Sequence, residues 1–287
     1  MSERSLTVPL PDDRGERAET VRRWRAAADD QVLLDGFHAI KHALRFGAEV
    51  KIAITEDRAA LLGLAAELAP DVAGPLADLV REVAPEDLRE LLSRVHPTRT
   101  AALAAPRDRA AQLRALAARP RSAPVIVLDH PRNLGNVGAV VRLAAGFGAT
   151  GVVTLDEGPV AAGGLDPWHP NVVRAAAGLH YATAVERLTL DQLPAGPLYA
   201  LDPEGEDIRN FALPDDALLA FGSERHGISA GLRERADHLV SLPMRPQVSS
   251  YNLATSVAMT LFHWGGPRQE GTPVEGVGGG PVVPDLP

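Results

Sequence analysis

The sequence of 287 residues contains no cysteine, which excludes disulfides, thiolate catalysis and cysteine-ligated zinc. Aromatic residues make up only 4% of the chain, and Lys41 and Lys51 are its only lysines among 29 basic residues. No apolar run approaches the ~20 residues that a membrane span needs. The N-terminal stretch MSERSLTVPLPDDRGER lacks the apolar core of a signal peptide. We therefore expect a cytoplasmic protein that does not enter a membrane.

The formal net charge is −8, which argues against a protein that coats nucleic acid without specificity. The excess of arginine accompanies much alanine and proline, a composition typical of a genome rich in G and C. Two stretches are nevertheless locally basic: residues 22–25, with three arginines, and residues 94–121, with seven arginines and Asp108 as the single acid. Either stretch is a candidate for contact with phosphates.

Two α/β domains are predicted, separated by a linker. In the first, β-type runs at 30–35, 50–55 and 98–104 alternate with helical periods at 37–46, 59–68, 75–83 and 85–94. A Gly/Pro-rich C-terminal stretch is typical of disorder. The predicted organisation is a flexible arm, a small α/β domain, a linker or short exposed helix, a second α/β domain and a disordered tail, at residues 1–18, 19–105, 106–122, 123–265 and 266–287.

The second domain opens with a strand–loop–helix–strand unit. A buried strand at 125–128 precedes the polar turn HPRNLGN, a helix that ends near Gly146 and Gly148, and a strand at 151–155. Further strands are expected at 197–201, 217–221 and 238–242, and helices at 171–179 and 251–264. Polar loops at 130–136, 222–229 and 243–250 follow three of the strands. They should converge if these strands are parallel neighbours, since ligands bind at the carboxyl ends of such strands.

Several common sites are absent from the sequence. GNVGAV is not a dinucleotide fingerprint, no GxxxxGK[ST] phosphate loop occurs, and Ser223 lacks the GxSxG elbow. The histidines show no metal-ligand spacing, so we expect no metal.

Three ordered segments carry a family resemblance: PRNLGNVGAVVRLAAGFGATGVV, LLAFGSERHGIS and LPMRPQVSSYNLATSVAMTLF. Together they resemble the three motifs of the SpoU/TrmH family of RNA 2′-O-ribose methyltransferases, in the SPOUT superfamily, over residues 124–264. More weakly, residues 30–105 are similar to the ribosomal-protein-like RNA-binding domain that precedes many members. The resemblance implies a parallel-sheet α/β domain with a C-terminal trefoil knot, S-adenosylmethionine (SAM) as cofactor, and a homodimer with a composite active site.

The resemblance also implies two sets of site residues. The slot for SAM would be lined by Gly222, Leu242, Met244, Tyr251 and Leu253, with Tyr251 in place of the family's usual leucine. The catalytic set would be Arg142, Asn136, Glu224, Ser250 and Asn252. Because a guanidinium keeps its proton, Arg142 is better suited to hold phosphate and stabilise an alkoxide than to act as a base.

Simpler roles stay open for most of these residues. Arg142 would otherwise form an ion pair with Asp129 or Glu224, and Asn136 would be a plain helix N-cap. Ser250 would lie at or next to the N-cap of the last helix. Glu224 would be an ordinary surface carboxylate. Leu242 and Leu253 would be plain core, and the apolar last helix would be core or a dimer face. Asn133 is expected only to form the turn.

The sequence therefore indicates a SAM-dependent RNA 2′-O-ribose methyltransferase, with ribosomal RNA favoured as substrate. Transfer RNA is the alternative substrate within the same family. The alternative from another class is a non-catalytic RNA-binding or ribosome-assembly factor.

Overall fold

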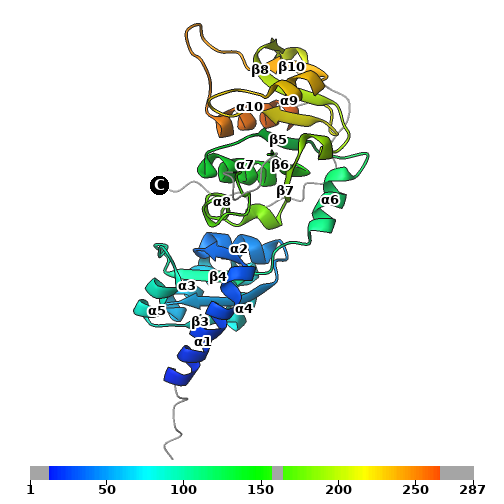
Figure 1. The fold of residues 1–287 in the computed structure, drawn as a ribbon. Helices are drawn as coiled ribbons and strands as arrows, with labels where there is room; N and C mark the ends of the chain where they lie inside the picture. Colours follow the sequence, from blue (N-terminus) through cyan, green and yellow to red (C-terminus); the bar gives the residue numbers. More distant parts are fainter. Residues whose placement is uncertain (1–12, 157–163, 266–287) are drawn as a thin grey trace, which may run out of the picture.

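The computed structural model describes residues 13–156 and 164–265. Two sheets follow one another along the length of the molecule, one formed by each half of the chain (Figure 1). Residues 1–12 of the predicted arm and the predicted tail 266–287 lie outside the described residues. No helix in the described parts of the chain is both long and apolar enough to span a bilayer.

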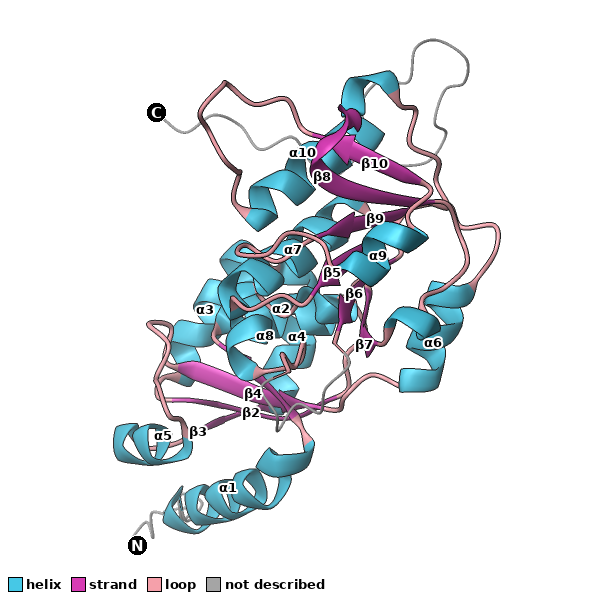
Figure 2. Cartoon of the chain, turned by 45° about the horizontal axis from the view of Figure 1, so that its top comes forward, coloured by secondary structure: helices cyan, strands magenta, loops and turns pink. Residues whose placement is uncertain are grey.

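The N-terminal domain is a four-stranded sheet in the order β1-β4-β2-β3, in which β4 runs antiparallel to β1 and β2. Its strands are β1 (Val32–Asp35), β2 (Val50–Thr55), β3 (Val80–Glu82) and β4 (Thr100–Ala104). Its helices are α1 (Asp13–Ala27), α2 (Phe37–Arg45), α3 (Arg58–Leu68), α4 (Pro70–Leu79) and α5 (Pro85–Leu91). Helices α1 and α5 cover one face of the sheet, and α2, α3 and α4 cover the other (Figure 2).

Two features of this domain differ from the sequence prediction. Helix α1 begins at Asp13 and so includes residues 13–18, for which the sequence predicts a flexible arm. The helix expected over 75–83 instead ends at Leu79, and residues 80–82 form β3, which pairs in parallel with β2. A strand of three residues is too short to show an alternating pattern, so the helical period of the preceding residues masks it.

The C-terminal domain confirms the predicted α/β class with a parallel sheet. Six parallel strands lie in the order β10-β8-β9-β5-β6-β7. They are β5 (Val125–Asp129), β6 (Gly151–Leu155), β7 (Ala184–Leu188), β8 (Leu198–Asp207), β9 (Leu218–Phe221) and β10 (His238–Ser241). The helices are α6 (Arg109–Ala117), α7 (Leu134–Phe147), α8 (Pro170–Ala175), α9 (Ala230–Arg235) and α10 (Leu253–Gly265). Apolar clusters fill both faces of the sheet, as expected of a parallel sheet.

The sequence prediction differs from the structure at three elements of the C-terminal domain. Strand β7 and helix α9 were missed, and β8 continues to Asp207 although a strand was expected only to 201. Glu186 and Arg187 break the apolar pattern of β7, because this edge strand binds polar partners on α6 and in the loop after β6. Helix α9 has only six residues, fewer than two helical turns.

Helix α7 is fixed by its two ends and by close packing. Asn133 caps its N-terminus by accepting a hydrogen bond from the backbone N–H of Asn136, at 3.0 Å, and Gly148 ends it in the left-handed conformation (φ 72°). A Cβ atom at Gly138 would lie 2.4 Å from Ala175 Cβ of α8. Glycine at this position therefore allows α7 and α8 to approach each other closely.

The two domains pack directly against each other. Nδ1 of His42 on α2 lies 2.9 Å from the carbonyl oxygen of Ala177, and the Tyr181 hydroxyl donates to the Ala105 carbonyl at 2.8 Å. Gly178 has a φ of 72°, and a Cβ there would lie 2.4 Å from the Ala39 carbonyl oxygen. Hence α2 sits directly against the C-terminal domain, with backbone touching backbone.

Candidate active site

The three predicted polar loops lie at one edge of the C-terminal sheet. They follow β5, β9 and β10, and all six strands are parallel, so their carboxyl ends share that edge. Strands β5 and β9 are direct neighbours, while β8 lies between β9 and β10. The predicted convergence of the loops is confirmed.

A hydrogen-bonded chain of three side chains joins the loops. Asn252 donates from Nδ2 to Oδ1 of Asn136 at 3.1 Å, and Asn136 donates from Nδ2 to Oε1 of Glu224 at 2.6 Å. Each residue comes from a different loop or helix start: after β5, after β9 and before α10. The structure thus brings together three of the five predicted catalytic residues.

Residues other than Asn136 and Ser250 cap the N-termini of α7 and α10. Asn133, for which we expected only a turn-forming role, caps α7, and Asn136 lies in the first turn of that helix. Asn252 occupies the capping position of α10, because its Oδ1 accepts from the backbone N–H of Ala254 at 2.9 Å. The alternative explanations of Asn136 and Ser250 as N-caps are therefore wrong, and the side-chain amide of Asn136 is free to bridge Asn252 and Glu224.

A cavity of about 600 Å³ opens among the same loops. This volume lies within the range of small-molecule sites. Its lining includes all five residues predicted to hold the cofactor, and three of the predicted catalytic set: Gly222, Leu242, Met244, Tyr251, Leu253, Glu224, Ser250 and Asn252. Asn136 contacts this group through its hydrogen bonds to Glu224 and Asn252.

Close backbone packing and one tyrosine shape the cavity. A Cβ at Gly222 would lie 2.0 Å from the Gly227 carbonyl carbon, so the loop after β9 can fold back only on a glycine. Leu253 is buried and belongs to the main apolar cluster, so it serves core and cavity together. The Tyr251 hydroxyl donates to the Pro243 carbonyl at 2.9 Å and closes the loop after β10.

One wall of the cavity was missed by sequence reasoning. Leu201, Asp202 and Pro203 of β8 line it. Asp202 is buried and forms an ion pair with Arg233 at 2.5 Å. No motif marks this wall. It follows only from the position of β8 between β9 and β10, which the sequence does not reveal.

Arg142 lies apart from this cavity in the same chain. It is not among the lining residues, its side chain is exposed, and among the described residues it forms no ion pair. The simpler explanation of an ion pair with Asp129 or Glu224 is wrong: Asp129 binds the His130 ring and the Ser229 backbone N–H, each at 2.6 Å, and Glu224 accepts from Asn136. Arg142 lies six residues after Asn136 on α7. This separation rotates it about 120° around the helix axis and moves it about 9 Å along that axis.

Residues 123–262 match the family described as the SpoU rRNA Methylase family. The C-terminal domain of this chain belongs to the SpoU methylase family. The matched range begins just before β5 and ends within α10, so it contains the whole six-stranded sheet.

Individual proteins agree with the assignment to the SpoU family. The chain is 32% identical to the 23S rRNA (guanosine-2′-O-)-methyltransferase RlmB of Pseudomonas putida, over 48% of this chain and 56% of that protein. It is 30% identical to an uncharacterized tRNA/rRNA methyltransferase of Archaeoglobus fulgidus, over 48% of this chain and 62% of that protein. The crystal structure of the AdoMet-bound rRNA methyltransferase from Sinorhizobium meliloti has the same fold, with a TM-score of 0.66 and 22% identity over 91% of this chain and 95% of that one. The chain spans only 24% to 62% of the length of the first curated relatives that it matches.

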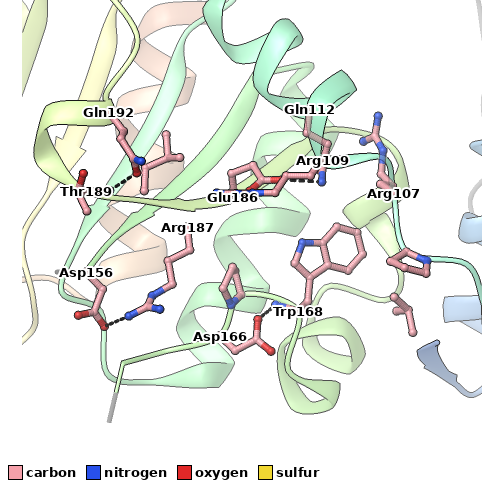
Figure 3. Close-up of a pocket in the computed structure, with 14 residues that line it drawn as sticks. Arg107, Arg109, Gln112, Asp156, Asp166, Trp168, Glu186, Arg187, Thr189 and Gln192 are labelled. Atoms are coloured by element: carbon pink, nitrogen blue, oxygen red, sulfur yellow. Dashed lines mark hydrogen bonds and ion pairs between the residues drawn. The ribbon is translucent and has the colours of Figure 1, made fainter. Parts of the chain in front are cut away.

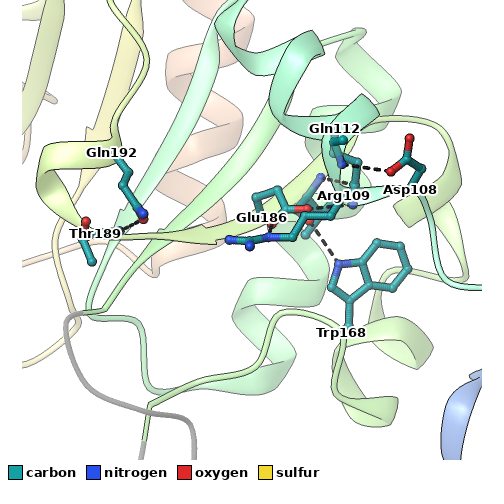
Figure 4. Close-up of polar contacts among 9 residues, drawn as sticks. Asp108, Arg109, Gln112, Trp168, Glu186, Thr189 and Gln192 are labelled. Atoms are coloured by element: carbon teal, nitrogen blue, oxygen red, sulfur yellow. Dashed lines mark hydrogen bonds and ion pairs between the residues drawn. The ribbon is translucent and has the colours of Figure 1, made fainter.

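A second cavity, of about 580 Å³, lies elsewhere in the SpoU-type domain, between α6, β7 and the residues before α8 (Figure 3). Its polar groups are bound to one another: Gln112 donates to Glu186 at 2.9 Å, Arg109 lies 3.2 Å from the same carboxylate, and the Trp168 indole donates to the Val185 carbonyl at 3.1 Å (Figure 4). Burial raises the pKa of Glu186, and the hydrogen bond and charge of Arg109 oppose that shift. We interpret this cavity as a structural junction that fastens α6 to the sheet edge.

The basic stretch 94–121 is used largely for internal contacts. Arg107 donates to the Thr183 carbonyl at 2.7 Å, and burial lowers its pKa. Arg121 is buried and donates to the backbone carbonyls of Leu116 and Ala195. Both arginines fasten the predicted linker to the domain, so neither is available to phosphates. No group of three or more potential metal-ligating side chains occurs within residues 13–156 and 164–265.

Proposed function

We propose that this protein transfers a methyl group from SAM to a ribose 2′-hydroxyl of structured RNA, with ribosomal RNA as the substrate class. The observation that carries the proposal is the cavity between the three motif loops, bordered by the Asn252–Asn136–Glu224 chain. The SpoU family match and the rRNA 2′-O-methyltransferase activity named for the P. putida relative support it.

The lining of the cavity suits SAM. Leu242, Met244 and Leu253 offer an apolar wall for an adenine ring, and the loops after β9 and β10 offer backbone groups for hydrogen bonds. The absence of a side chain at Gly222 lets the loop after β9 fold back on itself at Gly227 and so form its side of the cavity. When bound, SAM supplies an electrophilic methyl group for attack by the ribose oxygen.

The side chains around the cavity would align the substrate and stabilise the charge that develops on the ribose oxygen. Asn136 and Asn252, held by each other and by Glu224, present fixed amide groups at the cavity edge. Ser250, exposed on the loop before α10, is within the lining and would contact the ribose. Arg142 would hold an RNA phosphate and stabilise the alkoxide, since its guanidinium remains protonated.

We further propose a homodimer in which Arg142 completes the active site of the partner subunit. The position of Arg142 supports this, because it is exposed, lies outside the lining of its own chain's cavity and has no ion-pair partner among the described residues. Exposed apolar side chains on the packed helices α7 and α10 would suit an interface: Phe147 is 36% exposed and Phe262 is 68% exposed.

Three finer features complete the proposal. The first is a trefoil knot formed by the segment after β9, supported by the way α10 returns to pack on α7. The second is RNA binding by the N-terminal domain, residues 19–105. The third is a cytoplasmic location with no metal requirement, in keeping with a ribosomal RNA substrate.

Calorimetry with SAM tests the proposal against a non-catalytic RNA-binding or assembly factor. A methyltransferase binds SAM in this cavity, and binding should weaken when Gly222 is replaced by alanine while replacement of the unobstructed Gly63 has no effect. No heat of binding at millimolar SAM would contradict the proposed function. Transfer RNA as substrate would be recognised by mapping the methylated ribose positions in a mixture of both RNAs.

A further inference from the structure

Helix α2 of the N-terminal domain presents a row of basic side chains on one face. His38, Lys41 and Arg45 are spaced at i, i+3 and i+7, so they lie one above another along the helix. The opposite side of α2 is buried, with Phe37, Ile40 and Ala43 in the core. Arg45 is already held by Asp71 in a bidentate ion pair, at 2.7 and 2.6 Å. The described residues provide no such ion pair for His38 or Lys41.

Arg142 of the C-terminal domain lies close to this row. Helices α2 and α7 both contact the turn Leu179–Tyr181, which lies between them at the domain boundary. The charges are near enough to act on one another. Burial lowers the pKa of Lys41, and so do the charges of Arg45 and Arg142, with Asp71 opposing. Burial also lowers the pKa of His38, together with Lys41, Arg142 and His96.

The close approach of these cations is built into the fold. The contact of His42 with the Ala177 carbonyl, and the packing of Ala39 against Gly178, hold α2 at the domain boundary. An ion pair between Asp35 at the end of β1 and Arg174 on α8 fastens the same boundary. Because α2 and α7 are held in place at this boundary, Lys41 and Arg142 stay in the same region of the free protein, and their like charges repel each other there.

We propose that His38, Lys41 and Arg142 together bind one phosphodiester group of the substrate RNA, across the boundary between the two domains. This inference rests on the proposed function and deepens it. Lys41 and His38 become substrate-positioning residues, and the N-terminal domain contacts the RNA next to the arginine that serves the reaction.

A phosphodiester is the ligand that this geometry favours. Lys41 and Arg142 form no ion pair within the described residues, and an anion bound between them would be attracted by both charges. Arginine and lysine bind phosphate in complementary ways. The guanidinium group can donate two parallel hydrogen bonds to the phosphate oxygens, and the ammonium group binds as a compact positive charge. Contacts to phosphate fix the register of an RNA without reading its bases. The cluster therefore serves placement, and base recognition has to come from elsewhere.

The two lysines of the chain provide a matched experiment. Lys41→Ala removes the proposed phosphate contact, and Lys51→Ala removes an exposed lysine of the same domain that pairs with Glu49. The probe is a fluorescein-labelled oligouridylate, and its affinity is measured at several salt concentrations. We expect Lys41→Ala to weaken binding several-fold and to reduce the slope of log affinity against log salt by about 0.7, the value for one contact to a single strand. Lys51→Ala should match the wild type, and Lys41→Arg should retain the slope.

The kinetics of methyl transfer give a second measurement. A purely structural role of Lys41 would not produce the expected change in KM alone. Lys41→Ala should raise the KM for ribosomal RNA and leave kcat and SAM affinity unchanged, because a phosphate contact binds ground state and transition state alike. An unchanged salt slope in Lys41→Ala, or no binding of the oligouridylate by the wild type, would overturn the inference. Lys41-dependent oligouridylate binding by a protein that fails to bind SAM would instead leave the RNA site standing and overturn the proposed methyltransferase function.

Discussion

Asn136 donates a 2.6 Å hydrogen bond from its Nδ2 to Oε1 of Glu224, although the two residues are 88 positions apart in the chain. The bond ties the start of α7 to the loop after β9. Asn252 extends it to the start of α10, through a 3.1 Å bond to the same asparagine. One amide side chain therefore sets the relative position of all three motif loops around the cavity.

Asn136→Asp should disrupt this arrangement while hardly changing side-chain size. The new carboxylate would face Glu224 where the amide now donates, and two carboxylates at that distance repel each other. We expect methyl transfer to fall about 100-fold, since small displacements of aligned groups have effects of that size. Asn210→Asp is the matched control, because Asn210 also donates to a glutamate, Glu206 at 3.0 Å, outside the site. Equal loss in both variants would contradict the role of Asn136.

Arg142→Ala should retain SAM affinity and lose methyl transfer. The side chain is exposed and outside its own chain's cavity, so its removal disturbs neither folding nor the cofactor slot. Mixed dimers test which subunit it serves. When Arg142→Ala and Asn136→Ala chains are combined, an arginine that acts on the partner subunit leaves one intact site, and activity returns. An arginine that acts within its own subunit leaves no intact site, and the mixture stays inactive.

Tyr251→Phe should weaken SAM binding by releasing the loop after β10. The phenol hydroxyl holds the Pro243 carbonyl at 2.9 Å, and loss of one such bond corresponds to roughly a two- to tenfold change in affinity. Calorimetry measures the change. Tyr199→Phe serves as the control, because Tyr199 lies outside the cavity lining. If Tyr199→Phe weakened SAM binding equally, the proposed role of the Tyr251 hydroxyl in closing the loop would be contradicted.

Acid should destabilise the protein through His180. The ring is fully buried, its Nε2 lies 2.8 Å from the Pro167 carbonyl, and burial lowers its pKa from 6.5 to about 4. The unfolded chain binds the proton more tightly, so this stability is present above pH 6.5 and is lost as pH falls towards 4. The loss amounts to about 3 kcal/mol. Urea midpoints across that range should fall less steeply in His180→Gln, which keeps a donor for the carbonyl. Parallel curves for the two proteins would refute the assignment.

Much of the site could be predicted from sequence because its residues follow strands. Gly222, Leu242, Met244, Tyr251 and Leu253 all line the cavity, since parallel strands deliver their loops to one edge. The local rules also predicted the C-terminal end of helix α7, where glycine at 148 permits a left-handed residue.

The rest depended on packing that local patterns do not encode. The period of α7 already separates Asn136 from Arg142, but only the position of α2 at the domain boundary shows that the charge of Arg142 acts on Lys41 of the other domain. Strand β7 escaped prediction because the polar Glu186 is stabilised by Gln112, a partner 74 residues away. Likewise, Asp202 can be placed in the cavity wall only when the position of β8 in the strand order is known.

Transfer of a labelled methyl group tests the central claim most directly. The protein is incubated with SAM that carries a tritiated methyl group and with ribosomal RNA, and the RNA is then digested to nucleosides. We predict that the label appears in a 2′-O-methylated nucleoside, and that Asn136→Asp reduces it about 100-fold. Label found only on a base, or no label in any RNA although the protein is folded, would contradict the account.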